Sequence, residues 1–199
     1  MADRLSPRAR QIVAAARELL EKDGADALTM RRLADRLGIR APSLYKHFPD
    51  KAAVEAELIA EGMEEMARAL EAAETAGPAE AASLAEAAGP AEAAGQVEAA
   101  GPADVMAGLG AAYRAYARAH PHLYRLMTTG PLPRDLLPPG LEDRTAMPLV
   151  RVVGDPDRAR AAWAFAHGMV MLELDGRFPP GADLDPAWRA GLAALVRPV

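Results

Sequence analysis

Apolar positions recur at helical spacing over residues 7–23, the first of three such patterns within the first fifty residues. Ser6 is a candidate N-cap, and Pro7 suits the first position of a helix. One face of the expected helix is apolar throughout and carries Ile12, Val13, Ala16, Leu19 and Leu20. Gly24 follows and predicts the end of the helix.

Two shorter patterns follow and complete a helix-turn-helix. Thr29 is the candidate N-cap of a second helix, which ends at Gly38, a residue suited to a left-handed cap. A third helix opens at Pro42, buries Leu44 and Phe48 one turn apart, and stops at the next proline. The remaining side chains of this third helix face away from the core. Two short helices joined by a tight turn are the arrangement that lays a recognition helix in the major groove of DNA, although many helical proteins contain this arrangement without binding DNA.

The rest of the chain is also helical in pattern. A long helix from residue 51 to about residue 73 repeats an apolar or small residue every four positions: Val54, Leu58, Gly62, Met66 and Leu70. Two helices broken at Pro121, a short helix at 146–150, an apolar helix at 161–172 and a final helix complete the order. The sequence therefore predicts an all-α protein with an amino-terminal helix-turn-helix domain over 1–51 and a helical domain over 52–199.

A repeat interrupts the second domain at about 76–104. Ala-Gly-Pro recurs at 76–78, 88–90 and 100–102, which gives a period of twelve residues. Each unit carries almost no bulky apolar residue, which argues against a stacked solenoid. We interpret the segment as an insertion of frayed helix and linker.

Charge divides the chain in the same way as the helical patterns. The formal net charge is -5 overall, but residues 1–51 hold eleven Lys and Arg against seven Asp and Glu. A basic head on an acidic body is typical of a local attraction to nucleic acid, although chance clustering also gives such an asymmetry. The chain has no cysteine, and no apolar run is long enough for a membrane span or a secretory signal. We therefore expect a cytoplasmic protein with no membrane contact.

Two stretches resemble a known family. "LTMRRLADRLGIRAPSLYKHFPDKAAV" closely resembles the amino-terminal domain of TetR-family transcriptional repressors, and the resemblance covers about residues 8–55. Arg40 stands where that family often has serine. "WAFAHGMVMLELDGRF" is similar to the Trp-x-x-x-His-Gly signature of one class of TetR carboxy-terminal domains, here Trp163, His167 and Gly168.

The resemblance implies two groups of DNA contacts. The phosphate-binding residues would be Thr29, Tyr45, His47 and Lys51. The groove-facing residues would be Arg40, Ala41, Pro42, Ser43 and Lys46. The alternative for Tyr45 and His47 is packing against the first helix, and for Arg40 and Lys46 it is simple solvation.

The apolar helix at 161–172 has no polar face and needs cover on both sides. We expect it and the final helix to pair with their copies in a four-helix dimer interface, as the resemblance also implies. The expected interface residues are Trp163, Val170, Leu174, Trp188, Leu192 and Leu195. A dimer would place two recognition helices about one duplex turn, roughly 34 Å, apart and so predicts a palindromic operator. The alternative is a monomer with a buried central helix.

A set of aromatic, methionine and histidine residues in the second domain has the composition of a small-molecule cavity. Its members are Tyr113, Tyr116, His120, Tyr124, Met127, Met147, Phe165 and Met169. The alternative for each of them is ordinary core.

The expected function is that of a repressor that a small, mainly apolar effector releases from double-stranded DNA. The alternative is an architectural DNA-binding protein without ligand control. The chain has no motif of a catalytic, metal or cofactor site, so we expect no enzyme activity, metal or cofactor.

Overall fold

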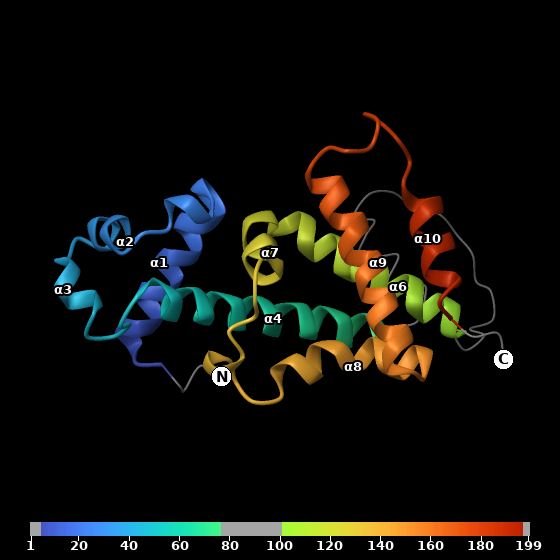
Figure 1. Cartoon of the computed structure of the whole chain (residues 1–199), viewed down its shortest axis with the longest axis horizontal. Helices are drawn as coiled ribbons and strands as arrows, with labels where there is room; N and C mark the ends of the chain where they lie inside the picture. Colours follow the sequence, from blue (N-terminus) through green and yellow to red (C-terminus); the bar gives the residue numbers. More distant parts are fainter. Residues whose placement is uncertain (1–4, 77–100, 197–199) are drawn as a thin grey trace. The chain divides into compact units, whose positions relative to one another are not determined.

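The computed structural model describes residues 5–76 and 101–196, and every regular element within these ranges is a helix (Figure 1). This confirms the predicted all-α class. The chain packs as two units, one formed by residues 1–64 and 120–141 and the other by residues 65–119 and 142–199. These packing units do not follow the predicted division at residue 51, which concerns function and stays a prediction.

Unit 1 opens with α1 (Pro7–Asp23), which has the predicted start and end. The Ser6 hydroxyl accepts a hydrogen bond from the Ala9 amide at 3.2 Å. Gly24 ends the helix with a φ of 81°, in the left-handed region that favours glycine. The predicted apolar face is buried and forms the centre of the core of unit 1.

The helix-turn-helix follows the short 3₁₀ helix η1 (Ala25–Ala27) and consists of α2 (Met30–Arg36) and α3 (Ala41–Leu44). Gly38, in the turn between α2 and α3, has a φ of 64°. The third helix is shorter than predicted, because residues 45–47 form a turn rather than further helix. The Leu44 carbonyl accepts from the amides of both His47 and Phe48, at 2.8 and 3.0 Å, which tightens this end. Leu44 and Phe48 are nevertheless buried, as predicted.

The long helix α4 (Lys51–Thr75) contributes its first half to unit 1, where it packs against α7 (Pro121–Thr128). Gly62 makes this packing close: a Cβ atom there would lie 2.4 Å from Met127 Sδ. The helix α7 also packs on α1. After α7 the chain forms the 3₁₀ helix η2 (Arg134–Leu136) and reaches Leu141, which is buried with the apolar side chains of α4.

Unit 2 contains the second half of α4 and the helices α6 (Pro102–Ala119), α8 (Leu141–Val153, from its second residue onward), α9 (Pro156–Leu174) and α10 (Asp185–Ala193). The helix predicted at 146–150 is longer than expected and begins at Leu141. Glu142 and Asp143 lie in its first turn, where negative charge stabilises the free amides. The helices α6, α9 and α10 pack on one another.

Most of the predicted insertion at about 76–104, namely residues 77–100, lies outside the described residues. Among the helices that are described, none is both long and apolar enough to cross a membrane.

Candidate functional site

The residues predicted to contact DNA lie on or beside α2 and α3, and most of them are exposed. Thr29, Arg40, Pro42, Tyr45, Lys46 and His47 are exposed, whereas Ala41, Ser43 and Lys51 are partly buried. Tyr45 is 52% exposed, and neither it nor His47 belongs to the core of unit 1. Contact with DNA stays a prediction for all nine residues.

Positive charge on α2 divides into a neutralised and an uncompensated part. Arg32 donates to Asp23 at 2.6 Å, and Arg36 donates to Glu18, so both are tied to α1. Arg31 also lies on α2, is exposed, and has no hydrogen-bond or ion-pair partner among the described residues. Arg31 could not be singled out from the sequence, because only the folded arrangement reveals which arginines the α1 carboxylates neutralise.

Arg40 and Lys46 are likewise exposed and without a partner among the residues that the structure describes. Arg31, Arg40 and Lys46 therefore place three uncompensated positive charges on one surface. This surface is formed by α2, by α3 and by the turn after α3. A surface of this kind attracts phosphate without fixing the sequence that is bound.

Thr29 and Lys51 are held by local contacts. Thr29 Oγ1 accepts from the Arg32 amide at 3.2 Å and so caps α2, as predicted. Lys51 Nζ lies 3.1 Å from Glu55 Oε1 and 3.5 Å from the Ala25 carbonyl oxygen. These contacts place the ammonium group at the start of α4.

The predicted effector residues fall into both units. Tyr113, Tyr116, Phe165 and Met169 lie in unit 2 together with Met147, which is 38% exposed. The Tyr116 hydroxyl donates to Glu65 Oε2 at 2.9 Å. The Phe165 ring lies edge-on to Trp188, with ring centroids 5.9 Å apart.

The other three predicted effector residues, His120, Tyr124 and Met127, belong to unit 1. Tyr124 is fully buried, and Met127 packs against the core. His120 Nδ1 lies 3.5 Å from Glu21 Oε1 and 3.4 Å from Arg17 Nη2, which connects α7 to α1. Their role as effector ligands stays a prediction.

The predicted interface residues also differ in exposure. Val170, Trp188 and Leu192 are buried inside unit 2, whereas Trp163 is 49% exposed. Leu174 and Leu195 are partly buried. The three buried side chains would therefore pack beneath the residues of an interface and would not contact a partner themselves.

His167 stacks on Trp163, with ring centroids 5.9 Å apart and an interplanar angle of 25°. Partial burial lowers the pKa of His167 below its ordinary value. The neutral imidazole is therefore favoured on this part of α9.

Two ion pairs join the second half of α4 to α8 in unit 2. Arg144 donates two hydrogen bonds to the Glu71 carboxylate, both at 2.7 Å. Arg151 Nε donates to Glu74 Oε1 at 2.6 Å. The hydrogen bonds from Arg144 hold the pKa of Glu71 below its usual value. Neither pair could be predicted from the sequence, since the two partners of each pair are more than seventy positions apart in the chain.

Comparison with known proteins gives two family matches. Residues 12–58 match the model "Bacterial regulatory proteins, tetR family", and residues 106–195 match the model "Tetracyclin repressor-like, C-terminal domain".

Individual relatives agree with these matches. An uncharacterized HTH-type transcriptional regulator from Mycobacterium tuberculosis is 30% identical over 176 residues, which cover 83% of this chain and 69% of that protein. The class A tetracycline repressor from Escherichia coli is 46% identical over 52 residues, or 26% of this chain and 24% of that repressor's length. The chain is also similar to the crystal structure of a TetR variant from Acinetobacter baumannii AYE in complex with minocycline. That match has a TM-score of 0.60 and 22% identity, and it covers 96% of this chain and 94% of the other.

Proposed function

Because the chain belongs to the TetR family of bacterial regulatory proteins, we propose that it is a sequence-specific repressor that a small effector releases from a palindromic operator. One observation carries this proposal. The matched helix-turn-helix exposes Arg31, Arg40 and Lys46 without partners among the described residues, while neighbouring arginines are neutralised by α1. In such a regulator, Thr29, Tyr45, His47 and Lys51 bind phosphates, and Arg40 to Ser43 with Lys46 face the bases. The protein would act in the cytoplasm, where bacterial DNA lies.

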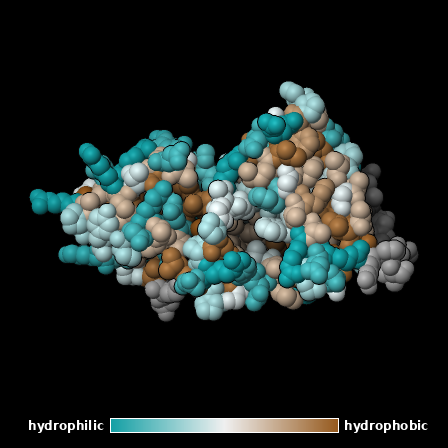
Figure 2. All heavy atoms as spheres, viewed as in Figure 1, coloured by the Kyte–Doolittle hydropathy of each residue, from teal (hydrophilic) through white to brown (hydrophobic). Residues whose placement is uncertain are grey.

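The proposed active form is a homodimer. Part of the α9 surface is exposed and apolar, and it includes Trp163, Ala164 and Leu172, with Gly168 partly buried. Figure 2 shows apolar side chains gathered over α9 and α10. Exposed apolar surface of this kind marks an interaction site, and a second copy of α9 has the matching apolar face. A two-fold dimer then presents two copies of α3 to two half-sites.

The proposed effector is small and mainly apolar, and it binds among those predicted aromatic and methionine residues that belong to unit 2. The chain is similar to a TetR variant that was crystallised with minocycline, which supports a ligand-responsive body. The helix α4 contributes to both units. An effector that shifts α4 would therefore also change how unit 1, which carries α3, binds DNA. A coupling of about 1–3 kcal/mol corresponds to a 5–150-fold loss of operator affinity.

The test begins with a DNA sequence selected from a random pool for binding to the full-length protein. Compounds that raise the melting temperature are then added to the complex of protein and selected DNA, and binding is followed by fluorescence anisotropy. We expect at least one such compound to weaken operator binding 5–150-fold.

Stabilising compounds that all leave operator affinity unchanged would contradict effector control. That outcome, together with equal binding to scrambled duplexes, would favour the alternative of an architectural DNA-binding protein. The same titration on Met169→Trp tests the site, because a larger side chain in the predicted effector site should either mimic the effector or block it.

A further inference from the structure

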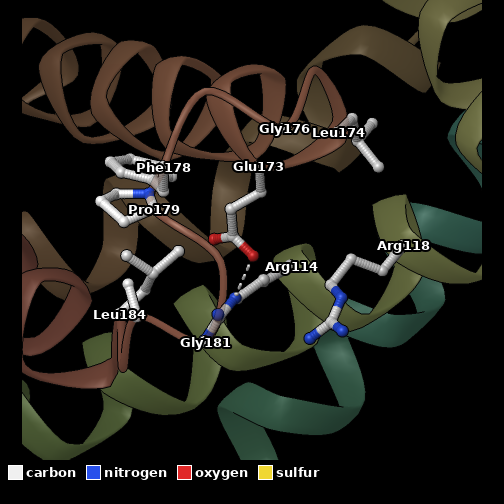
Figure 3. A pocket seen from close by; sticks show the side chains of 10 residues that line it. Arg114, Arg118, Glu173, Leu174, Gly176, Phe178, Pro179, Gly181 and Leu184 are labelled. Atoms are coloured by element: carbon white, nitrogen blue, oxygen red, sulfur yellow. Dashed lines mark hydrogen bonds and ion pairs between the residues drawn. The ribbon is translucent and has the colours of Figure 1, made fainter.

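A groove of about 350 Å³ lies in unit 2, and none of its lining residues belongs to the predicted effector set. It is bordered by α6, by the carboxyl end of α9 and by the loop at 176–184 (Figure 3). Its volume is within the range of small-molecule sites. The groove is therefore a candidate binding site separate from the predicted effector residues, and it shares only Leu174 with the expected dimer interface.

The floor of the groove is fixed by a network around Arg114. Arg114 Nε donates to Glu173 Oε2 at 2.9 Å, and its Nη1 donates to Asp185 Oδ1 at 2.6 Å. Trp188 Nε1 donates to the other Glu173 oxygen at 2.6 Å. Burial disfavours the charged form of Arg114, but the hydrogen bonds it donates to Asp185 and Glu173 raise its pKa above the ordinary value. The charge of Arg114 is thus fully engaged within the protein.

The loop wall is fixed by its backbone. Gly176 and Gly181 have φ values of 60° and 77°, a conformation that other residues rarely adopt. Pro179 and Pro180 between them restrict the chain further. A wall that is already ordered loses little conformational freedom when a ligand binds.

Arg118 lies one turn further along the same face of α6 than Arg114, but it differs from Arg114 in its exposure and in its partners. Its side chain lines the groove and is exposed. It has no hydrogen-bond or ion-pair partner among the described residues. Arg118 is therefore an uncompensated guanidinium at a preformed groove, and a guanidinium pairs with a carboxylate through two parallel hydrogen bonds.

The opposite side of the groove is apolar. Figure 3 shows Phe178, Pro179 and Leu184 across from Arg118. Leu174 and Ala182 also line the groove. A ligand that fits both sides has one anionic end and an apolar body.

The negative charges near the groove favour a ligand with a single negative charge. Asp183 lies at the end of the loop wall and Asp185 is the first residue of α10, and the Asp185 amide already donates to the Asp183 carboxylate at 3.0 Å. Their carboxylates disfavour a ligand with further negative charges. We infer that the groove binds a small monocarboxylic acid with an apolar chain, held by Arg118 at the carboxylate and by Phe178 and Leu184 at the chain. This inference is independent of the proposed release from DNA, because binding is measured on the protein alone.

Isothermal titration of the full-length protein with octanoate tests the inference. Octan-1-ol has the same chain length without the charge, and acetate has the charge without the chain. We expect octanoate to bind saturably and more tightly than either. Arg118→Gln should weaken octanoate binding by about tenfold or more and leave the weaker octan-1-ol binding unchanged.

Arg177→Gln is the matched control, because Arg177 is an exposed arginine of the same loop region that does not line the groove. It should keep full octanoate affinity. Phe178→Ala should weaken octanoate and octan-1-ol by the same factor, since it removes apolar contact only. The inference is wrong if octanoate does not bind saturably, if the two arginine variants lose the same factor, or if octan-1-ol binds as tightly as octanoate.

A second measurement locates the ligand without relying on a variant. In ¹³C-methyl spectra of leucine-labelled protein, octanoate should shift the signals of Leu174 and Leu184, which line the groove. Shifts confined to leucines of unit 1, such as Leu123, would place the ligand elsewhere and overturn the assignment.

Discussion

Lys46 and Lys51 lie five positions apart but have different surroundings. Lys46 is exposed and has no partner among the described residues, whereas Lys51 lies 3.1 Å from Glu55 and close to the Ala25 carbonyl. A lysine that reads a base contributes to one sequence, and a lysine that binds phosphate contributes to every sequence.

Lys46→Ala should therefore cost about 1–3 kcal/mol on the preferred operator and relax the base preference within each half-site. Lys51→Ala should weaken all duplexes alike and lower the salt slope by about one. Binding to the operator and to a scrambled duplex across a salt series distinguishes these effects. If both variants lose the same factor on both duplexes, the assignment of Lys46 to base contact is wrong.

Gly191 is a second residue whose surroundings decide its role. A Cβ atom at this position of α10 would lie 2.1 Å from Phe165 Cζ. The glycine therefore allows α9 and α10 to approach closely around the edge-on contact between Phe165 and Trp188.

Gly191→Ala should destabilise the protein by about 1–3 kcal/mol, because overpacking outweighs the higher helix propensity of alanine. Urea unfolding gives this value. Phe165→Leu removes the ring that would clash, so the double variant should lose less stability than the sum of the two single variants. Strict additivity would show that the alanine methyl group does not meet Phe165.

At the scale of elements, the second half of α4 is joined to α8 by the pairs Glu71–Arg144 and Glu74–Arg151. The pKa of Glu71 is lowered in the folded protein, chiefly by the hydrogen bonds from Arg144. In the unfolded chain this partner is lost and the pKa is higher. The stabilisation is therefore present at neutral pH and is lost as the pH falls through the folded pKa.

Arg144→Gln should lower the melting temperature at neutral pH, and the difference from the parent should shrink below about pH 4, where carboxylates become protonated. Arg160→Gln is the control, because Arg160 pairs with Asp157 on the exposed surface of its own helix. This control should change little at any pH. A difference for Arg144→Gln that does not depend on pH would show that Glu71 is not the group concerned.

Helix positions were predictable from local signals, but some lengths were not. Ser6 and Thr29 cap the helices that they were predicted to cap, since a side-chain cap depends only on residues three positions apart. The third helix ends early because Leu44 accepts two amides, and α8 begins early at Leu141. Both differences depend on packing and end geometry, to which apolar spacing is insensitive.

At the scale of the whole molecule, the site was predictable only in part. The exposed surface of α2 and α3 was predicted because a specific motif covers it, except for Arg31. The predicted effector residues were selected by composition, and the structure distributes them over two units. The groove at Arg118 could not be predicted, because the sequence does not show that Glu173 and Asp185 pair with Arg114 and leave Arg118 uncompensated.

If the protein forms the proposed dimer, a single charge on the apolar face of α9 should disrupt dimerisation and weaken operator binding. Leu172 is 43% exposed on the apolar face of that helix. Leu172→Glu would place a charge in the interface and should yield monomers in analytical ultracentrifugation. Operator affinity should fall by about 100-fold or more, because the two half-sites are no longer bound together.

Ala115→Glu, which adds the same charge at an exposed position of α6, should leave both the dimer and operator binding intact. A dimeric Leu172→Glu variant would show that the exposed face of α9 is not the interface.

The most direct test of sequence-specific regulation is the selection of duplexes bound by the full-length protein from a random pool, followed by titration of the selected and scrambled sequences at physiological salt. We expect an inverted repeat whose half-sites lie about one duplex turn, roughly 34 Å, apart. Two protomers should bind each duplex, at least about 1,000-fold more tightly than they bind scrambled DNA. Selection of no common sequence, with equal affinity for both duplexes, would contradict the assignment of this protein as a sequence-specific repressor.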